Sequence, residues 1–385
     1  MKVIELLDKF PKISETFILR EILAMQKRGI DIEVFAFIRS NEDVVHQEVQ
    51  EVRKITYLPD VPLLRKIYAH FYWFWKKPTH YVKTAAIASN PNNGITSLFL
   101  GNLHAVITIH DRKPDHIHAH WPKSSDFAML AYLLAGIPFS FTTHRYEIFD
   151  KPSKNYRIKS KLAKKHVTVT EYNRQYIIHN FGVMRSEVSV VHSAIDFKKD
   201  YPVADCKGKN TIISIARLEK IKGIDVLIQA CAILKKENIL FECLIVGDGT
   251  ERANLERLMK ELNLINEVVL VGYKTQEEVF RLLSRAKLLV LPSRSESLGN
   301  VFTEARACRV PVIGPNTRGV PEVIADGEDG FLVEPDNIDE LVNKIKILLT
   351  NEPLRREFIE KGYKKAFEEF NIDHETGKLL ELWKR

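Results

Sequence analysis

The sequence predicts an α/β protein made of two Rossmann-like domains that face a cleft. Short apolar runs alternate with segments of helical periodicity, which is typical of parallel sheets covered by helices on both faces. The length of 385 residues exceeds the usual size of a single hydrophobic core. The alternation is interrupted near Phe197–Asn210, a polar stretch that contains Pro202 and Gly208. We therefore place the two domains at residues 1–200 and 205–369.

Each domain is expected to contain six strands. Those of the first domain are Val3–Leu7, Ile32–Phe37, His116–His118, Phe139–Thr142, Val167–Thr170 and Val188–Val191. Those of the second domain are Thr211–Ile215, Phe241–Val246, Val268–Val271, Leu288–Leu291, Val310–Ile313 and Gly330–Val333. Helices lie between them, since the apolar residues between the strands recur at helical spacing, as in Ile224, Leu227, Ile228, Cys231 and Leu234.

The net charge of +7 is unevenly distributed. Residues 1–200 hold 29 lysines and arginines against 20 acids, which gives +9, whereas the remainder holds 28 against 30, which gives −2. The first half therefore favours an anionic partner, such as a membrane face, a lipid diphosphate or a nucleic acid. It shows no RNA-binding module signature, so we expect no nucleic acid partner.

The remaining bulk features favour a cytoplasmic protein. The four cysteines show no spacing typical of metal ligands, which indicates a reducing compartment. They are Cys206, Cys231, Cys243 and Cys308. The first apolar residues, Val3 to Leu7, are interrupted by Glu5 and resemble a strand rather than a signal peptide. No apolar run approaches the length of a membrane-spanning helix.

The most informative segment is Ser293–Ile313, SRSESLGNVFTEARACRVPVI. It carries two glutamates eight residues apart, Glu296 and Glu304, and between them Gly299 is expected to open a helix. The preceding strand would place both carboxylates and the free N–H groups of the helix start at its carboxyl end, where open α/β sheets bind ligands. Carboxylates suit hydroxyl groups and a helix start suits an anion, and a sugar attached to a nucleotide diphosphate offers both.

The Glu296-to-Glu304 pattern is followed by VPVIG and by GVPEVIADGEDGFLVEP, and it resembles the C-terminal half of the retaining glycosyltransferases of family 4, which have the GT-B fold. IARLEKIKGIDVL resembles the diphosphate segment of that family. FPKISETFILREI and IPFSFTTHRYEIFD resemble the branch that builds bacterial exopolysaccharides of the colanic acid type. The resemblance covers nearly the whole chain. It implies that a C-terminal helix at about 370–385 packs back on the first domain.

The resemblance also implies roles for individual residues. Arg217 and Lys222 would hold the donor diphosphate, Glu304 would grip the ribose, and Glu296 would contact the donor sugar. Two cations beside a helix start oppose the macrodipole by about 0.3–1 kcal/mol each unless an anion lies between them. His144 would touch the donor sugar or its phosphate. The other donor-binding residues would be Gly272, Tyr273, Leu298, Gly299, Asn300 and Val301. Leu298 replaces the usual aromatic residue, and Ala194 replaces the usual glycine before Asp196, so the donor identity stays open.

The histidines of HIHAH alternate and would share one side of a strand, as metal ligands sometimes do. They are His116, His118 and His120. No D-x-D carboxylate pair lies nearby in the sequence, and the similar enzymes need no metal. We therefore expect neither a metal nor another cofactor, and we expect His120 to reach the cleft. Gly247-Asp248-Gly249 lacks the third glycine of a dinucleotide fingerprint and indicates a tight turn only.

Residues 53–83 combine seven basic groups with a single acid, Asp60, and with eight aromatic residues. The basic groups are Arg53, Lys54, Arg65, Lys66, Lys76, Lys77 and Lys83. The aromatic run Phe71–Trp75 covers more than one helix face, so part of it can pack against the first sheet. The alternative is a helix that lies in the headgroup region of an anionic membrane. Both interpretations stay open at this point.

The function predicted from these features is that of a retaining, metal-independent hexosyltransferase of cell-surface polysaccharide biosynthesis. The donor would be a UDP- or GDP-sugar and the acceptor a lipid-linked saccharide or an oligosaccharide. The enzyme would be peripheral on the inner face of the cell membrane. The alternatives are a sugar-nucleotide epimerase of the same fold and, less favoured, a basic nucleic-acid-binding protein.

Overall fold

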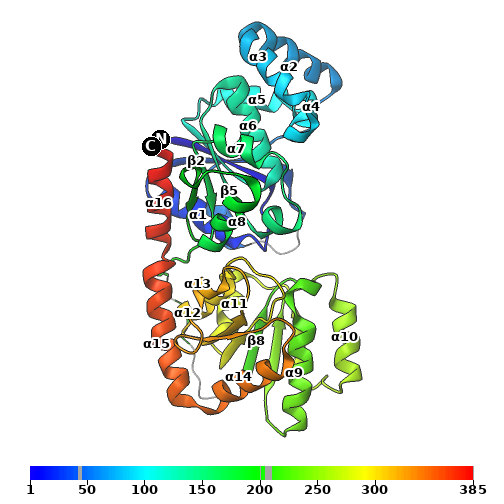
Figure 1. The fold of residues 1–385 in the computed structure, drawn as a ribbon, viewed down its shortest axis with the longest axis vertical. Coiled ribbons are helices and arrows are strands. Elements are labelled where there is room, and N and C mark those ends of the chain that lie inside the picture. Colours follow the sequence, from blue (N-terminus) through cyan, green and yellow to red (C-terminus); the bar gives the residue numbers. More distant parts are fainter. Residues whose placement is uncertain (42–45, 200, 204–209, 385) are drawn as a thin grey trace. The chain divides into compact units, whose positions relative to one another are not determined.

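The computed structural model describes residues 1–41, 46–199, 201–203 and 210–384. The chain divides into two compact units (Figure 1). One unit holds the described residues of 1–192 except His46, together with those from Glu375 onward. The other unit holds His46 and the described residues of 193–374.

The first unit is built on a seven-stranded sheet in the order β3-β2-β1-β4-β5-β6-β7, and all of its pairings are parallel. The strands are β1 (Lys2–Phe10), β2 (Asp31–Arg39), β3 (Ile55–Tyr57), β4 (His116–His120), β5 (Phe139–Thr143), β6 (Lys165–Thr168) and β7 (Val188–Val190). The six predicted strands are confirmed, with ends shifted by a few residues. The edge strand β3 was missed because its three residues are only half-buried and directly follow the charged residues Arg53 and Lys54, so no apolar run marks it.

Alternate residues of β1 face two different apolar layers. Ile4 and Leu6 pack in the layer that contains α5 (Leu103–Asp111) and α6 (Pro122–Ala135). Val3 and Leu7 pack in the layer that contains α1 (Thr16–Lys27) and the end of α16 (Ile372–Lys384), where Leu379 and Trp383 are buried (Figure 1). The β4 histidines face this second layer, because the Trp383 ring lies 5.7 Å from His116 and 5.3 Å from His118. The expectation that they share one face is confirmed.

The other helices of the first unit connect these strands. The α-helices are α2 (Leu63–Lys76), α3 (Pro78–Ala88), α4 (Thr96–Gly101), α7 (Tyr156–Leu162) and α8 (Glu171–Phe181). The short 3-10 helices are η1 (Gln47–Glu51), η2 (Pro91–Asn93) and η4 (Arg185–Glu187), and η3 (Tyr146–Asp150) is a π-helical turn. α2, α3 and α4 stand together at one end of this unit, beyond α5 and α6 (Figure 1).

The second unit is built on a six-stranded parallel sheet in the order β10-β9-β8-β11-β12-β13. The strands are β8 (Thr211–Ile215), β9 (Glu242–Val246), β10 (Val268–Gly272), β11 (Leu288–Val290), β12 (Val312–Pro315) and β13 (Phe331–Val333). All six were predicted. The strand order reverses between β8 and β11, as in doubly wound sheets that bind ligands at that point.

The helices of the second unit are η5 (Lys220–Lys222), α9 (Ile224–Lys236), α10 (Arg252–Glu261), α11 (Gln276–Leu283), α12 (Asn300–Ala307), α13 (Val320–Val323), α14 (Ile338–Thr350) and α15 (Glu352–Glu369). The division between the units falls at His192 and Ser193, shortly before the polar stretch expected there. Residues 200 and 204–209 of that stretch, with Cys206 and Gly208, lie outside the described residues. Cys231, Cys243 and Cys308 are buried free thiols.

Candidate functional site

The predicted donor residues of the second unit follow the two strands between which the strand order reverses. Arg217 and Lys222 come after β8, and the segment from Glu296 to Glu304 comes after β11. Because β8 and β11 are parallel neighbours, their carboxyl ends meet at one edge of the sheet. The structure therefore brings these two segments together, as the motif spacing predicted.

Lys222 and Glu296 form an ion pair through Nζ and Oε2. Their side chains keep only 14% and 12% exposure, so the pair is largely shielded from solvent. Shielding strengthens a charge–charge interaction, because the effective dielectric is lower than in water. The ammonium group is thus held at the sheet edge by one carboxylate.

Two backbone contacts clamp the Lys222 turn against the loop after β11. The Arg294 N–H donates to the Ile221 carbonyl at 2.8 Å. Gly223 has φ of +65°, and a Cβ at this position would lie 2.1 Å from the Pro292 carbonyl oxygen. Only glycine permits that approach. The clamp explains why the ends of two strands deliver a lysine and a glutamate to one place.

Arg294 supports the loop that carries Glu296, and the sequence analysis did not single it out. Its guanidinium binds both carboxylate oxygens of Asp225 at 2.9 and 2.7 Å and also lies 2.8 Å from Asp336. The hydrogen bonds that Arg294 donates to Asp225 raise the pKa of Arg294 above its usual value. The fork fixes the start of α9 to the loop after β11. No pattern in SRSES distinguishes this arginine from an exposed one.

Gly299 caps the start of α12 with φ of +78°. A Cβ there would lie 2.5 Å from ring carbons of Phe302, so the close packing of this turn requires glycine. Leu298 and Val301 are buried. Asn300 at the helix start and Glu304 one turn later are half-buried. The side chains of Leu298 and Val301 support the turn.

Arg217 is exposed and forms an ion pair with Glu219 at 2.8 Å. Its loop rests on the turn after β9: Leu218 donates to the Asp248 carbonyl at 2.9 Å, and a Cβ on Gly247 would lie 1.9 Å from the Ala216 oxygen. Gly247 and Gly249 therefore allow the turn after β9 to pack closely against the backbone of the Arg217 loop. This agrees with the tight turn predicted there.

Gly272 and Tyr273 end β10, two strands away from β8. The Gly272 carbonyl accepts the Gly247 N–H at 2.9 Å, which connects this corner to the Arg217 loop. Tyr273 is exposed. The structure thus joins these residues to Arg217 through the Gly247 turn.

In the first unit a buried cluster lies where the strand order reverses, between β1 and β4. His120 Nε2 lies 3.0 Å from Glu5 Oε1 and 3.4 Å from Glu21 Oε1. Its Nδ1 lies 3.1 Å from Nε2 of His144, which follows β5. His120 was expected to reach the cleft itself. It is buried instead, and it contacts His144.

The pKa values in this cluster are strongly shifted. Burial alone would lower the pKa of His120, but the contacts with Glu21 and Glu5 outweigh it and raise the pKa to about 10. Burial raises the pKa of Glu5 to about 7, against the lowering effect of His120. Burial and the neighbouring His120 lower the pKa of His144 well below its usual value. A cationic His120 beside a neutral His144 follows.

Trp121, directly after His120, has φ of +75° and ψ of 160°, a region that is essentially restricted to glycine. Such a conformation costs about 1–3 kcal/mol and is concentrated at functional sites. The Trp121 ring lies 4.7 Å from the His144 ring, and the Phe17 ring lies 5.0 Å from it. The strained turn therefore places an aromatic wall beside His144. The AHW segment did not reveal this strain.

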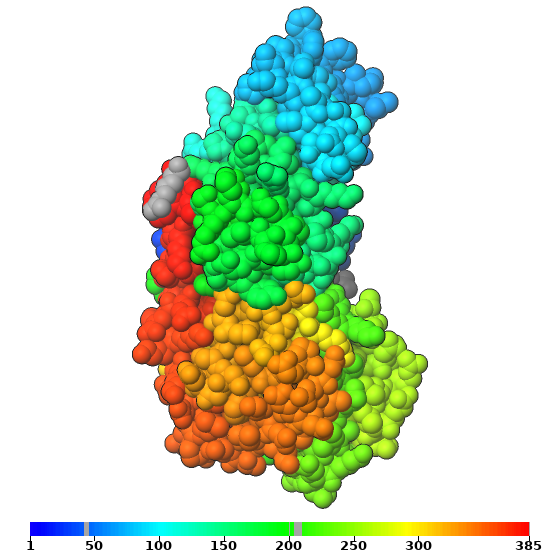
Figure 2. Space-filling view, viewed as in Figure 1, coloured from blue at the N-terminus to red at the C-terminus, as the bar shows by residue number. Residues whose placement is uncertain are grey.

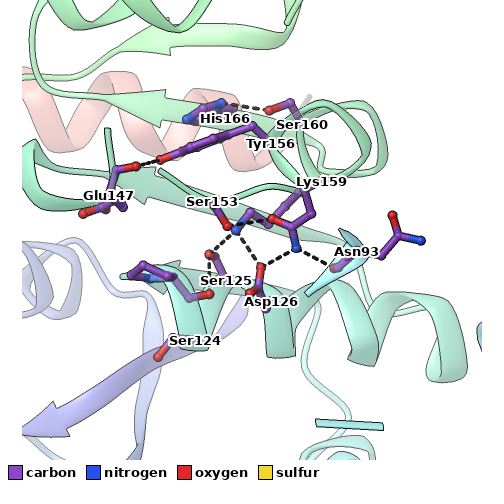
Figure 3. A network of polar contacts seen from close by, with 12 residues as sticks. Asn93, Ser124, Ser125, Asp126, Glu147, Ser153, Tyr156, Lys159, Ser160 and His166 are labelled. Atoms are coloured by element: carbon purple, nitrogen blue, oxygen red, sulfur yellow. Dashed lines mark hydrogen bonds and ion pairs between the residues drawn. The ribbon is translucent and has the colours of Figure 1, made fainter. Parts of the chain in front are cut away.

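Buried polar contacts surround Glu147 and Lys159, close in the chain to His144 (Figure 3). The backbone N–H of His144 donates to Glu147 Oε1 at 2.7 Å, and the Tyr156 hydroxyl donates to the Glu147 carbonyl at 2.8 Å. Burial raises the pKa of Glu147 to about 8, against the lowering effect of the His144 N–H. The Lys159 ammonium, buried nearby, donates to Asp126 at 2.7 Å and to Ser125 at 2.8 Å. The contact with Glu147 thus holds the backbone of His144.

Four side chains of the first unit have ligand-type atoms within 4.8 Å of one another: Glu5, Glu21, His118 and His120. His118 uses both ring nitrogens on hydroxyl groups, Nδ1 with Ser140 at 2.7 Å and Nε2 with Thr142 at 2.9 Å. His120 forms ion pairs with Glu5 and Glu21. The set therefore fits a proton-holding network better than a metal shell of four free ligands.

Helix α2 carries apolar residues on two opposite faces. Ala69 and Trp73 are fully buried, and the Trp73 indole donates to the Leu103 carbonyl at 3.3 Å. Leu64 and Trp75, on the opposite face with Tyr68 and Phe71 between them, are 80% and 79% exposed. Packing in the first unit is thus confirmed for Trp73, and the membrane interpretation of the exposed residues stays a prediction. The blue and cyan atoms of α2–α4 form one end of this unit in Figure 2.

Among the described residues, no helix has the length and apolar composition needed to cross a bilayer. Lys77 is tied to the fold, because its Nζ donates to the Ala135 carbonyl at 2.7 Å. Arg65 and Lys76 are exposed on α2.

Comparisons with known proteins agree with this architecture. The family model described as "Glycosyltransferase Family 4" matches residues 14–199, and that of "Glycosyl transferases group 1" matches residues 198–365. An uncharacterized glycosyltransferase of Methanocaldococcus jannaschii is 30% identical over 64% of this chain and 69% of its own length. The solved structure of Anabaena HepE with UDP and glucose has a TM-score of 0.79 at 19% identity, over 100% of this chain and 99% of that one.

A Campylobacter jejuni transferase is 29% identical over 54% of this chain and 57% of its own length. Its name is N-acetylgalactosamine-N,N'-diacetylbacillosaminyl-diphospho-undecaprenol 4-alpha-N-acetylgalactosaminyltransferase. Several curated relatives, this transferase among them, are matched over little more than half of their length. With both halves matched in order on two doubly wound sheets, the chain belongs to the GT-B glycosyltransferases of family 4.

Proposed function

We propose that this glycosyltransferase moves a hexose from a UDP- or GDP-sugar to a hydroxyl of a lipid-linked saccharide, with retention of configuration and without a metal. The observation that carries the donor part is the Lys222–Glu296 pair beside the start of α12. A cation, free helix N–H groups and a carboxylate at one sheet edge match a diphosphate joined to a sugar. Proteins with similar structures bind UDP and UDP-glucose, which supports this donor class.

In this proposal the departing nucleotide diphosphate is stabilised by Arg217, Lys222 and the N–H groups of the Gly299 turn. Preorganised donors of this kind act where charge develops during the reaction. Glu304 holds the ribose, Glu296 positions the donor sugar, and His144 contacts the sugar or its phosphate. Gly272 and Tyr273 contact the base. Ion pairing with Glu296 in the absence of donor keeps Lys222 in place.

The second unit would bind the donor and the first unit the acceptor. A lipid-linked acceptor is supported by the undecaprenol-linked substrate in the name of the Campylobacter jejuni relative. The exposed apolar face of α2, with Arg65 and Lys76 nearby, supports a peripheral contact with an anionic membrane. A role in exopolysaccharide synthesis rests on the resemblance of the first-half motifs.

The experiment is a thermal-shift screen of UDP-, GDP- and ADP-sugars followed by product analysis with and without acceptor. A ligand at 100 times its dissociation constant adds about 2.7 kcal/mol, enough to be seen. The anomeric configuration of the product, read by NMR, tests retention. Sugar-nucleotide conversion in the absence of acceptor would favour the epimerase and contradict the proposal.

The two glutamates provide a second test. Glu304→Gln is expected to weaken binding of both the donor and the free nucleotide diphosphate, because ribose is common to both. Glu296→Gln is expected to spare nucleotide binding and to reduce transfer. If calorimetry showed that Glu296→Gln weakens nucleotide binding and Glu304→Gln does not, the ribose would be assigned to Glu296 and the donor sugar to Glu304.

A further inference from the structure

We propose that Glu5, Glu21 and His120 form a buried chain that fixes the His144 ring in the tautomer with its proton on Nδ1. In this form His144 serves the substrate as a hydrogen-bond donor and not as a base. The inference rests on the proposed function only in that the donor sugar or its phosphate is the group that His144 meets. His120, Glu5 and Glu21 act through His144 and are positioning residues.

The geometry of the two rings supports a direct bond between them. His120 Nδ1 and His144 Nε2 are 3.1 Å apart. The rings are within 14° of coplanar, with centroids 5.4 Å apart. At this centroid separation a nearly coplanar pair joined through ring nitrogens lies edge to edge, which is the arrangement that a straight N–H···N bond requires. One of these two nitrogens must carry the proton and the other must accept it.

The carboxylates decide which nitrogen that is. His120 Nε2 lies between Glu5 Oε1 and Glu21 Oε1, both acceptors when ionised. The negative charges of Glu5 on β1 and Glu21 on α1 favour the cationic form of His120, which carries a proton on each ring nitrogen. Nδ1 of a cationic His120 can only donate, so His144 Nε2 must accept, and the remaining proton of His144 then sits on Nδ1.

The other titratable groups around His120 support this assignment. They are His118 on the same strand, Glu15 before α1 and Glu147 after β5, and His118 is kept neutral because burial lowers its pKa. Burial raises the pKa of both Glu15 and Glu147, and the charge of His120 opposes that rise. Among the described residues, no group hydrogen-bonds to Nδ1 of His144, so that donor remains for a ligand.

The opposite polarity is the competing arrangement. If His120 were neutral with its proton on Nε2, its Nδ1 would accept from His144 Nε2–H, and His144 Nδ1 would be a base. The two arrangements place the His144 proton on different atoms. They are therefore distinguishable in the folded protein without any substrate.

The decisive measurement is ¹⁵N NMR of histidine-labelled full-length protein near pH 7.5, with His120 and His144 assigned through His120→Asn and His144→Asn. We expect a doubly protonated His120 and a neutral His144 with a protonated Nδ1. Neutral His120 with His144 protonated on Nε2 would overturn the proposal. Because no donor is added, this result does not depend on whether the protein transfers sugar.

Turnover of side-chain replacements provides the second readout. An asparagine amide occupies the place of Nδ1 and a glutamine amide that of Nε2, so His144→Asn is expected to keep about tenfold more transfer than His144→Gln, the worth of one hydrogen bond. Glutamine better than asparagine would overturn the donor role. If the unaltered protein shows the expected NMR pattern but transfers no sugar, the proposed function is contradicted and the tautomer assignment stands.

Removing the carboxylates tests the chain itself. In Glu5→Gln/Glu21→Gln, His120 is expected to lose its second proton at pH 7.5, and the His144 proton is expected to move to Nε2. Glu33→Gln is the matched control, since Glu33 is a buried carboxylate on β2 that bonds Thr56 at 2.9 Å and Arg112 at 3.3 Å. It should leave the histidine signals unchanged. If the double variant does not fold, the spectrum of the unaltered protein still decides the matter. One equivalent of zinc retained by the purified protein would also overturn the proposal.

Discussion

Lys222 is the residue on which the donor site depends most directly. Lys222→Ala removes the cation and leaves the shielded Glu296 carboxylate without its partner. Loss of one preorganised charge stabiliser typically lowers turnover by about 10²–10³-fold. Steady-state kinetics should show this loss with the fold retained by circular dichroism. Lys220→Ala, on the same turn but exposed, is the control and should stay near the unaltered rate. Near-normal turnover in Lys222→Ala would remove this lysine from the site.

Glu147 is predicted to make the stability of the first unit pH-dependent. Burial raises its pKa to about 8, so the folded state binds its proton more tightly than the unfolded state does. The stabilisation is therefore complete below pH 4.5 and is lost as the pH rises through 8. Glu147→Gln should flatten the fall in Tm between pH 6 and pH 9. If Glu147→Gln and the unaltered protein show the same dependence of Tm on pH, ionisation of Glu147 does not destabilise the fold and the prediction is wrong.

At the scale of elements, the turn into α12 depends on Gly299. Gly299→Ala meets both a left-handed φ and the ring of Phe302 at 2.5 Å. The left-handed backbone alone costs about 1–2 kcal/mol. Gly327→Ala is the control for the backbone cost alone, because Gly327 has a φ of +74° and a Cβ there would meet nothing within 4 Å. Urea unfolding should show a larger loss for Gly299→Ala than for Gly327→Ala, and the donor should bind more weakly. Equal losses would mean that Phe302 moves away freely.

Helix α2 is predicted to bind vesicles rich in anionic lipid. Its exposed face holds Leu64, Tyr68, Phe71 and Trp75, and each cation near such a surface adds about 1 kcal/mol. Arg65→Glu/Lys76→Glu and Phe71→Ser/Trp75→Ser should each reduce co-sedimentation, and salt should weaken binding. Lys77 is left intact because it bonds the Ala135 carbonyl.

Arg257→Glu/Lys260→Glu on α10 changes the charge equally at exposed positions of the other unit and should leave vesicle binding intact. Equal recovery of the unaltered protein with neutral and anionic vesicles would show that the exposed face of α2 serves another purpose.

At the scale of the whole molecule, the expectation of metal independence can be tested directly. In the proposed function, Arg217, Lys222 and the start of α12 supply the positive charge that a bound metal ion would otherwise supply. Added chelator should therefore leave both Tm and transfer unchanged, with an untreated sample as the reference. A loss of transfer that returns with a divalent cation would assign that charge to a metal instead. A fall in Tm that returns with zinc would point to the Glu5, Glu21, His118 and His120 cluster.

The sequence by itself determined both sheets and most of the donor segment. Twelve strands were visible because most of them are buried apolar runs, whereas the edge strand β3 is only half-buried and directly follows the charged residues Arg53 and Lys54. The helix start at Gly299 and the placement of Lys222 opposite Glu296 follow from local turn signals and strand order. Only the tertiary structure decided which buried polar groups meet. Glu5, Glu21, His120 and His144 come from four segments of the chain, and their contacts and proton positions depend on sheet register and burial, which no local pattern encodes.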